Sequence, residues 1–270
     1  MAAIPVIRIN PDLSPRRERI SDNDFCIVVD DFLSEPGALV EFAATHPDAF
    51  SHPNIGYPGV QIRVNDDAMK DIFRFVRSSM SKEFGFMRAR IGIRSLLSMV
   101  TAPPNELSPL QRICHIDPNQ DTGRGKYAAL VYLFSDERLG GTSFYRWKNE
   151  ALVWEAAKLL REDADKGEAF LEEHFETFRE PPRYMIESNE IAERLCTISP
   201  RFNRFVFYSG DIPHSGAIAA PELLSDDPRK GRLTLNLFFS VLPKSDVADG
   251  GRAFVLAGAG PVSAAPSRSR

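Results

Sequence analysis

The sequence predicts a mainly β fold with flanking helices, built as one domain over residues 23–244. Two observations predict it. The second half of the chain carries long runs of apolar, β-branched and aromatic residues, at 130–134, 205–208 and 233–241. Turn-forming pairs such as Gly140-Gly141 separate these runs. Strands this apolar are typical of sheets buried between two layers.

The first half of the chain mixes helices with strands. Residues 1–22 are polar and charged, and we expect an N-terminal arm. Ser34 followed by Glu35-Pro36 indicates a helix start, because proline fits where no N–H is needed. Apolar residues at helical spacing predict a second helix over 66–84. Strands are predicted at 25–29, 87–101, 111–117, 126–134, 142–147, 203–208 and 233–241.

Residues 149–200 interrupt the strand pattern. They are charged and rich in Ala, Glu, Leu and Lys, which predicts a helical insertion between strands of one sheet system. Because loops on a rigid scaffold usually carry specificity, we expect this insertion to form a lid. Trp154, Phe175 and Phe178 would line a pocket there, although packing between helices explains them equally well. Residues 245–270 predict a disordered tail.

Composition excludes several classes of protein. The net charge is −4, so nucleic acid is not an expected partner. The three cysteines form no CxxC pair, which argues against a disulfide framework or a zinc-thiolate site and favours a cytoplasmic protein. The chain shows neither an apolar run of about 18 residues nor the pattern of a signal peptide, so no membrane partner is expected. The oligomeric state is left open.

His115 and Asp117 are the first candidate metal ligands. Alternate residues of a strand point to the same side, so these two share a face while Cys114 and Ile116 take the other. Turn-forming residues follow Asp117 and place the pair at the mouth of the strand. Taken alone, the pattern favours a structural histidine beside a capping aspartate, and the position at the mouth of the strand is what favours metal binding.

His214 supplies a second imidazole. It follows the apolar run at 205–208 and the turn Ser209-Gly210-Asp211. Two histidines and one carboxylate leave coordination positions open for a co-substrate and O2, as in non-haem iron(II) oxygenases. The remaining histidines lie in polar or helical stretches, where we expect solvated side chains: His46, His52 and His174.

Arg232 and Thr234 share a face at the start of the last strand. An inward-facing arginine there needs an anion, because an unpaired buried charge is costly. A guanidinium binds a carboxylate through two parallel hydrogen bonds, and a hydroxyl adds a third. Either an acidic side chain of the chain or a bound co-substrate fills this role.

These segments together resemble the iron(II)- and 2-oxoglutarate-dependent dioxygenase superfamily, nearest in pattern to its prolyl-4-hydroxylase-like branch. The resemblance covers about residues 23–243 and leaves the insertion unmatched. The matching stretches are HIDPNQDTGRGKYAALVYL (115–133), GGTSFYRW (140–147), RFVFYSGDIPHSG (204–216) and RLTLNLFF (232–239).

The resemblance implies a double-stranded β-helix, which is a distorted jelly roll with helices outside. It implies that His115, Asp117 and His214 bind iron(II). Arg232 matches the residue that binds the far carboxylate of 2-oxoglutarate, with Thr234 assisting.

Three positions stay open within the resemblance. Tyr132 matches a strand tyrosine that contacts the co-substrate, and a core tyrosine is an equal interpretation. The gap from His214 to Arg232 is longer than usual, so Arg229 and Lys230 are alternative anchors. Ala102 falls where the branch often has a tyrosine, with Thr101 and Ser98 as substitutes.

The implied activity is hydroxylation of an unactivated C–H bond of a small molecule or a peptide side chain. The reaction consumes O2 and 2-oxoglutarate and releases succinate and CO2. Two other classes remain. A cupin-like barrel would bind metal or ligand without consuming 2-oxoglutarate, and an interaction module with an incidental triad would have no affinity for iron.

Overall fold

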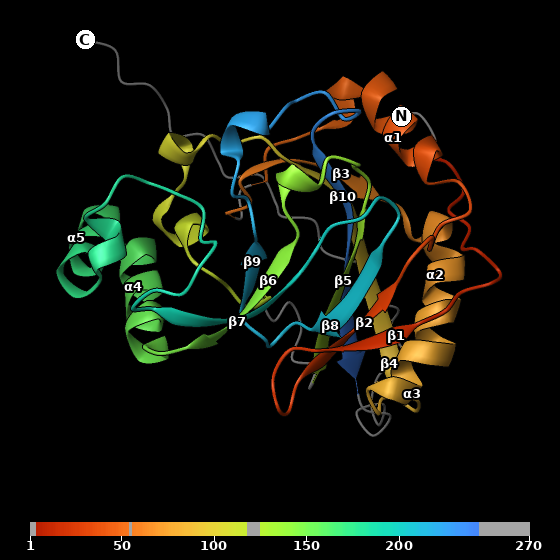
Figure 1. Cartoon of the computed structure of the whole chain (residues 1–270), viewed down its shortest axis with the longest axis horizontal. Coiled ribbons are helices and arrows are strands. Elements are labelled where there is room, and N and C mark those ends of the chain that lie inside the picture. The colour runs from red at the N-terminus through yellow and green to blue at the C-terminus, as the bar shows by residue number, and fades with distance from the viewer. Residues whose placement is uncertain (1–3, 54–55, 118–124, 243–270) are drawn as a thin grey trace, which may run out of the picture.

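The computed structural model describes residues 4–53, 56–117 and 125–242, and its strands form two antiparallel sheets (Figure 1). The larger sheet has the order β1-β2-β8-β5-β10-β4-β3 and the smaller β7-β6-β9. Every pairing in both is antiparallel. The predicted mainly β class is confirmed.

The element bounds are as follows. The larger sheet contains β1 (Arg16–Arg19), β2 (Phe25–Val29), β3 (Gly59–Val64), β4 (Arg90–Val100), β5 (Gly125–Tyr132), β8 (Phe205–Ser209) and β10 (Arg232–Leu242). The smaller sheet contains β6 (Thr142–Trp147), β7 (Ala192–Ile198) and β9 (His214–Gly216). The helices are α1 (Pro36–Thr45), α2 (Lys70–Phe75), α3 (Ser81–Glu83), α4 (Glu150–Glu162) and α5 (Ala164–His174).

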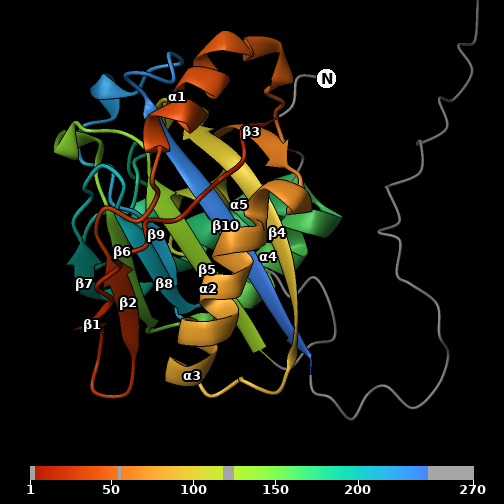
Figure 2. The same cartoon turned by 90° about the vertical axis from the view of Figure 1, so that its right-hand side faces the viewer.

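Alternation along β10 gives the larger sheet two different faces. The odd-numbered residues from Leu233 to Val241 are all buried in a core shared with the helices α1 and α2. Figure 2 shows α2 and α3 in front of this face. The even-numbered residues lie on the opposite side, which we call the inner face.

The smaller sheet packs over part of the inner face. Phe144 of β6 and Ile198 of β7 form a second core with residues of β2, β5 and β8, including Val206 and Tyr208. Two antiparallel sheets packed face to face, with helices outside, make the double-stranded β-helix that the sequence patterns imply. A functional group placed between these sheets is held by rigid strands on both sides.

Four local predictions differ from the structure. No strand covers 111–117, because Pro109–Arg112 forms a 3-10 turn closed by a capping box from Ser108. Strand β3 was not predicted, and β7 lies inside the segment predicted as helical. Within the predicted arm, residues 16–19 pair with β2 as strand β1.

The predicted tail, 245–270, lies outside the described residues. Across the described part of the chain, no helix combines the length and apolar character needed to cross a membrane.

Candidate metal centre

The three predicted ligands meet between the two sheets. His115 and His214 form an isolated antiparallel bridge, in which each backbone N–H donates to the other's carbonyl at 3.0 and 2.8 Å. The N–H of Asp117 donates to the carbonyl of Gly210 at 2.9 Å. One ligand atom from each of the three side chains lies within 4.8 Å of the others. Segments almost 100 positions apart thus converge on one point.

His214 presents a free nitrogen to this point. Its Nδ1 lies 2.8 Å from the carbonyl oxygen of Ile212, which only accepts, so Nδ1 carries the proton. Its Nε2 therefore keeps a lone pair, 3.8 Å from Oδ1 of Asp117. Burial lowers the pKa of His214 to about 4, so the ring is neutral at pH 7. A neutral, oriented imidazole is what a metal ion binds.

Asp117 is a buried carboxylate that has one oxygen without a hydrogen-bond partner among the described residues. Its Oδ2 forms no hydrogen bond with any described residue. Lys126 donates to the backbone carbonyl of Asp117 at 2.9 Å and pairs with the side chain of Asp211. Burial raises the pKa of Asp117 to about 6, against the opposing effects of His115 and Lys126. An unpaired buried carboxylate is costly, and a bound cation would remove that cost.

Gly210 leaves room for this carboxylate. A Cβ at Gly210 would lie 2.9 Å from Oδ2 of Asp117, closer than real Cβ contacts. His115 is the exposed member of the triad, so solvent reaches the centre from its side. Lost hydration, and then the neighbouring His214, lowers the pKa of His115. Two imidazole nitrogens and one carboxylate oxygen fit iron(II) with open coordination positions.

Arg232 lies buried beside the centre. Its Nε donates to the carbonyls of Leu139 and Gly140 at 3.1 and 3.2 Å, and Nη2 donates to Gly141 at 2.8 Å. Among the described residues no carboxylate lies within ion-pair distance of it. Three carbonyls orient the guanidinium without neutralising its charge.

The two alternative anchors point elsewhere. Arg229 forms a two-bond ion pair with Glu41 on the surface, at 2.7 and 3.0 Å. Lys230 lies 3.7 Å from Asp227 and is exposed.

Hydroxyl groups surround the guanidinium of Arg232. Thr234 donates to the carbonyl of Ser98 at 3.3 Å, and Tyr132 shares a 2.8 Å hydrogen bond with Thr142. Tyr57 was assigned only to a turn, yet its buried hydroxyl lies close to Thr234 and Ser98 without a hydrogen bond to any described residue. Burial raises the pKa of Tyr57 to about 12, and the nearby charge of Arg232 opposes the shift. No sequence signal marks Tyr57.

Arg232 lies close to the strand that carries His214. A Cβ on Gly216 would lie 3.5 Å from Nη2 of Arg232. His214 is two residues earlier on the same strand and on the same face, which is about 6.6 Å away. A five-carbon diacid held by Arg232 at one end would reach the triad with the other.

A family model matches residues 11–239. The chain belongs to DUF6445, a family of unknown function. No curated protein matches the sequence. Family membership alone therefore assigns no activity, and the side chains of the site must carry any proposal.

Solved structures similar to this DUF6445 chain include two of prolyl hydroxylases. One is from Phytophthora capsici (14% identity, 83% of this chain, 65% of that chain, TM-score 0.41). The other is from Pseudomonas putida (11%, 77%, 86%, 0.41). HygX from Streptomyces hygroscopicus, with nickel and 2-oxoglutarate bound, is also similar (13%, 81%, 83%, 0.37). The chain spans slightly under two thirds of the Phytophthora protein, and identity this low identifies neither reaction nor substrate.

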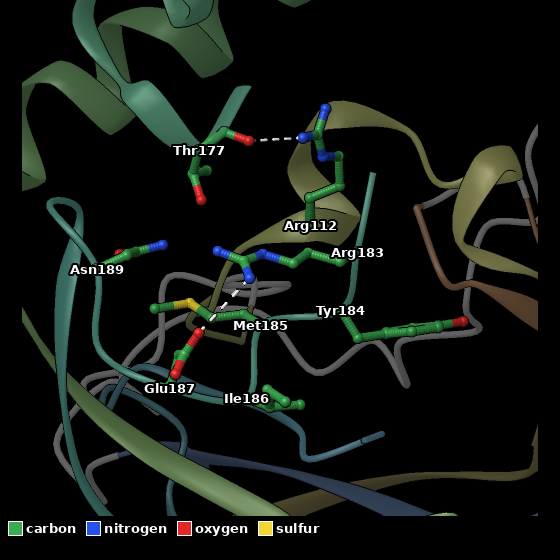
Figure 3. Close-up of a pocket in the computed structure, with 8 residues that line it drawn as sticks. All are labelled: Arg112, Thr177, Arg183, Tyr184, Met185, Ile186, Glu187 and Asn189. Carbon is green, nitrogen blue, oxygen red and sulfur yellow. Dashed lines mark hydrogen bonds and ion pairs between the residues drawn. The ribbon is translucent and has the colours of Figure 1, made fainter. Parts of the chain in front are cut away.

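The segment that follows α5 packs directly behind the histidines of this DUF6445 chain. The carbonyl of Met185 accepts from Tyr145 and Ser215 at 3.0 and 3.2 Å, and its sulfur accepts from the N–H of Cys114. Figure 3 shows the neighbouring pocket, where Arg112 donates to the carbonyl of Thr177. No triad residue lines this pocket.

The aromatic residues of the insertion divide into two groups. Phe175 and Phe178 are buried with α4 and α5, so packing accounts for them. Trp154 is exposed and donates to Glu150.

Proposed function

We propose that this protein is an iron(II)- and 2-oxoglutarate-dependent oxygenase in which His115, Asp117 and His214 hold the metal. The single observation that carries the proposal is the buried Oδ2 of Asp117, which has no hydrogen-bond partner among the described residues and lies within reach of two imidazoles. That donor set matches non-haem iron(II) sites. When bound, iron(II) with 2-oxoglutarate and O2 supplies the oxidising chemistry, and succinate and CO2 are released.

Arg232 is the proposed anchor for the far carboxylate of 2-oxoglutarate. It is buried, pre-oriented by three carbonyls and unpaired with any acid among the described residues. Thr234 and Tyr132 lie on the same face of the sheet and would complete the site with hydroxyl groups. The second carboxylate and the oxo group then face the triad.

The protein's own groups orient the metal ligands and exclude water from the site. The hydrogen bond from Nδ1 of His214 to Ile212 fixes the ring and leaves Nε2 for the metal. Tyr208 and Phe144 pack around the ring of His214, with Tyr208 at 4.9 Å between ring centroids. We propose residues 23–244 as the oxygenase domain, the insertion 149–200 as its lid, and a small molecule or a peptide side chain as the group hydroxylated.

The test is an anaerobic titration with iron(II) and 2-oxoglutarate, monitored by the weak visible charge-transfer band of the chelate. We expect the band in wild type and its loss in Asp117→Ala. Asp71→Ala is the matched control, because Asp71 pairs with Arg74 on the surface of α2. Succinate release with candidate substrates then identifies the reaction.

Two other results would redirect the assignment. Iron binding without affinity for 2-oxoglutarate would favour the cupin-like binding barrel. Absence of iron binding by folded wild-type protein would refute the metal assignment.

A further inference from the structure

Two arginines stand on the inner face beyond the proposed co-substrate site. Arg94 of β4 lies opposite Phe238 of β10, and Arg63 of β3 lies opposite Leu96 of β4. Residues paired across strands share a face, as do positions two apart along a strand. Arg63 and Arg94 therefore project on the same side as Thr234 and the triad.

This part of the inner face is open. Along β10, Arg232 and Thr234 are buried, whereas Asn236, Phe238 and Ser240 are partly exposed. The smaller sheet covers the side formed by β2, β5 and β8. On the side formed by β10, β4 and β3, the end that carries Phe238, Arg94 and Arg63 is therefore accessible, whereas the other end is buried.

The two arginines lack acidic partners among the described residues. Neither forms an ion pair there, and no hydrogen bond from either side chain was found. Strands β3, β4, β5 and β10 contain no Asp or Glu, although the chain has 37. Burial, and then the positive charge of Arg63, lowers the pKa of Arg94. Two neighbouring cations on a face without acids form a site for an anion.

Arg94 lies within reach of the triad, and Arg63 lies one strand further away. The row Tyr208, Ala128, Phe238, Arg94 crosses four adjacent strands. Strands are about 4.8 Å apart, so the backbone of Arg94 is about 14 Å from that of Tyr208. The ring of Tyr208 contacts His214, and a long arginine side chain shortens the remaining gap. A compact molecule spans it, resting on Phe238.

We propose that Arg63 and Arg94 bind an anionic group of the substrate, a carboxylate or a phosphate, and so hold its reacting carbon toward the metal. The inference rests on the proposed function for the identity of the site as a substrate site. The anion site itself stands on the register and on the charges of the two arginines.

The test uses calorimetric titration of anaerobic protein loaded with iron(II) and 2-oxoglutarate, so that the metal and Arg232 are occupied. The probes are phenyl phosphate, benzoate and the neutral benzamide. The proteins are wild type, the double variant Arg63→Gln/Arg94→Gln, and the control Arg88→Gln/Arg161→Gln. The control removes the same charge from exposed arginines on other surfaces.

We expect wild type and control to bind at least one anionic probe and to bind benzamide at least tenfold more weakly. The double variant should lose tenfold or more in affinity for the anion. A stronger response to phenyl phosphate than to benzoate would indicate a phosphorylated substrate, and the reverse a carboxylated one.

The proposal is overturned if no anionic probe binds wild type, if benzamide binds equally well, or if the control loses as much affinity as the double variant. The chelate band, recorded in the same samples, separates this failure from that of the proposed function. A normal band with no anion binding leaves the oxygenase assignment intact. Anion binding without a band leaves only the anion site.

Discussion

Replacing Arg232 by glutamine tests the co-substrate site most directly. The side chain is buried and holds its charge against three backbone carbonyls. Glutamine keeps a hydrogen-bond donor but removes the positive charge and the paired N–H groups that bind a carboxylate through two parallel hydrogen bonds. Metal-free Arg232→Gln should be less stable than wild type, because carbonyls of the 139–141 turn lose donors, at about 1–3 kcal/mol for each group left unpaired.

The loss of affinity for 2-oxoglutarate can be measured separately from this loss of metal-free stability. A hydrogen bond to a charged group contributes about 1.5–3 kcal/mol, so losing a two-bond fork costs about 3 kcal/mol, or roughly 100-fold in affinity. At a 2-oxoglutarate concentration of about 100 times the wild-type Kd, wild type gains about 2.7 kcal/mol of stability. A variant with 100-fold weaker binding gains only about 0.4 kcal/mol.

The assay is urea unfolding of each protein under anaerobic conditions, with iron(II), in the presence and absence of 2-oxoglutarate. Comparing the increment within each variant removes the difference in metal-free stability. Arg229→Gln is the matched control, because that arginine pairs with Glu41 on the surface. Its increment should equal that of wild type.

A full increment in Arg232→Gln would refute the assignment of the anchor. Loss of the increment in Arg229→Gln instead would move the anchor into the loop before β10. Either result would also show that the burial of Arg232 serves the fold alone.

Three further substitutions test neighbouring features. Gly210→Ala places a methyl group 2.9 Å from the carboxylate of Asp117, so iron(II) affinity should fall about tenfold in a metal titration. Tyr57→Phe removes a hydroxyl that lacks a partner among the described residues; metal-free stability should change by less than about 1 kcal/mol, while 2-oxoglutarate binds about fivefold more weakly. Asp30→Asn should cost about 2 kcal/mol at pH 7, because hydrogen bonding from Arg204 lowers the pKa of Asp30 to about 2.

The pH dependence of the last variant follows from the direction of that shift. The folded pKa lies below the unfolded value of 3.8, so the stabilisation is complete above about pH 4 and is lost as the pH falls toward 2. The difference between wild type and Asp30→Asn should therefore close over this window in acid unfolding. A constant difference would contradict the ion-pair explanation.

For Gly210→Ala, unchanged affinity for iron(II) would contradict the prediction. For Tyr57→Phe, unchanged affinity for 2-oxoglutarate would do so.

The three predicted ligands come together in the structure, although one premise of their prediction is wrong. His115 and Asp117 were placed on a predicted strand at 111–117, which the structure lacks. Their alternate N–H groups still bond to the segment 210–214, as in a short stretch of sheet, so the two side chains share a side. The alternation of side chains along this short stretch was sufficient, because the prediction needed only positions 115 and 117 to point to the same side.

Features that depend on strand register escaped the sequence. Strand β3 is short and carries Gln61 and Arg63 among its apolar residues, so no hydrophobic pattern in the sequence predicts it. Without β3, neither Tyr57 beside Arg232 nor the pairing of Arg63 with β4 was predictable. Strand β7 is buried only at its two ends, and its charged sequence was assigned to the helical insertion.

The charges of the inner face explain why the site would favour anions at two different depths. If iron(II) is held by one carboxylate and two neutral imidazoles as proposed, it would keep a net positive charge, and strands β3, β4, β5 and β10 add arginines without acids. At the buried end, Arg232 is held by the carbonyls of the 139–141 turn, and we propose that it binds the small carboxylate of the co-substrate. At the open end, the partly exposed Arg94 and the exposed Arg63 would bind the anionic group of a larger molecule. The same positive field would thus attract both anions, and the difference in burial would direct the small one to Arg232 and the larger one to Arg63 and Arg94.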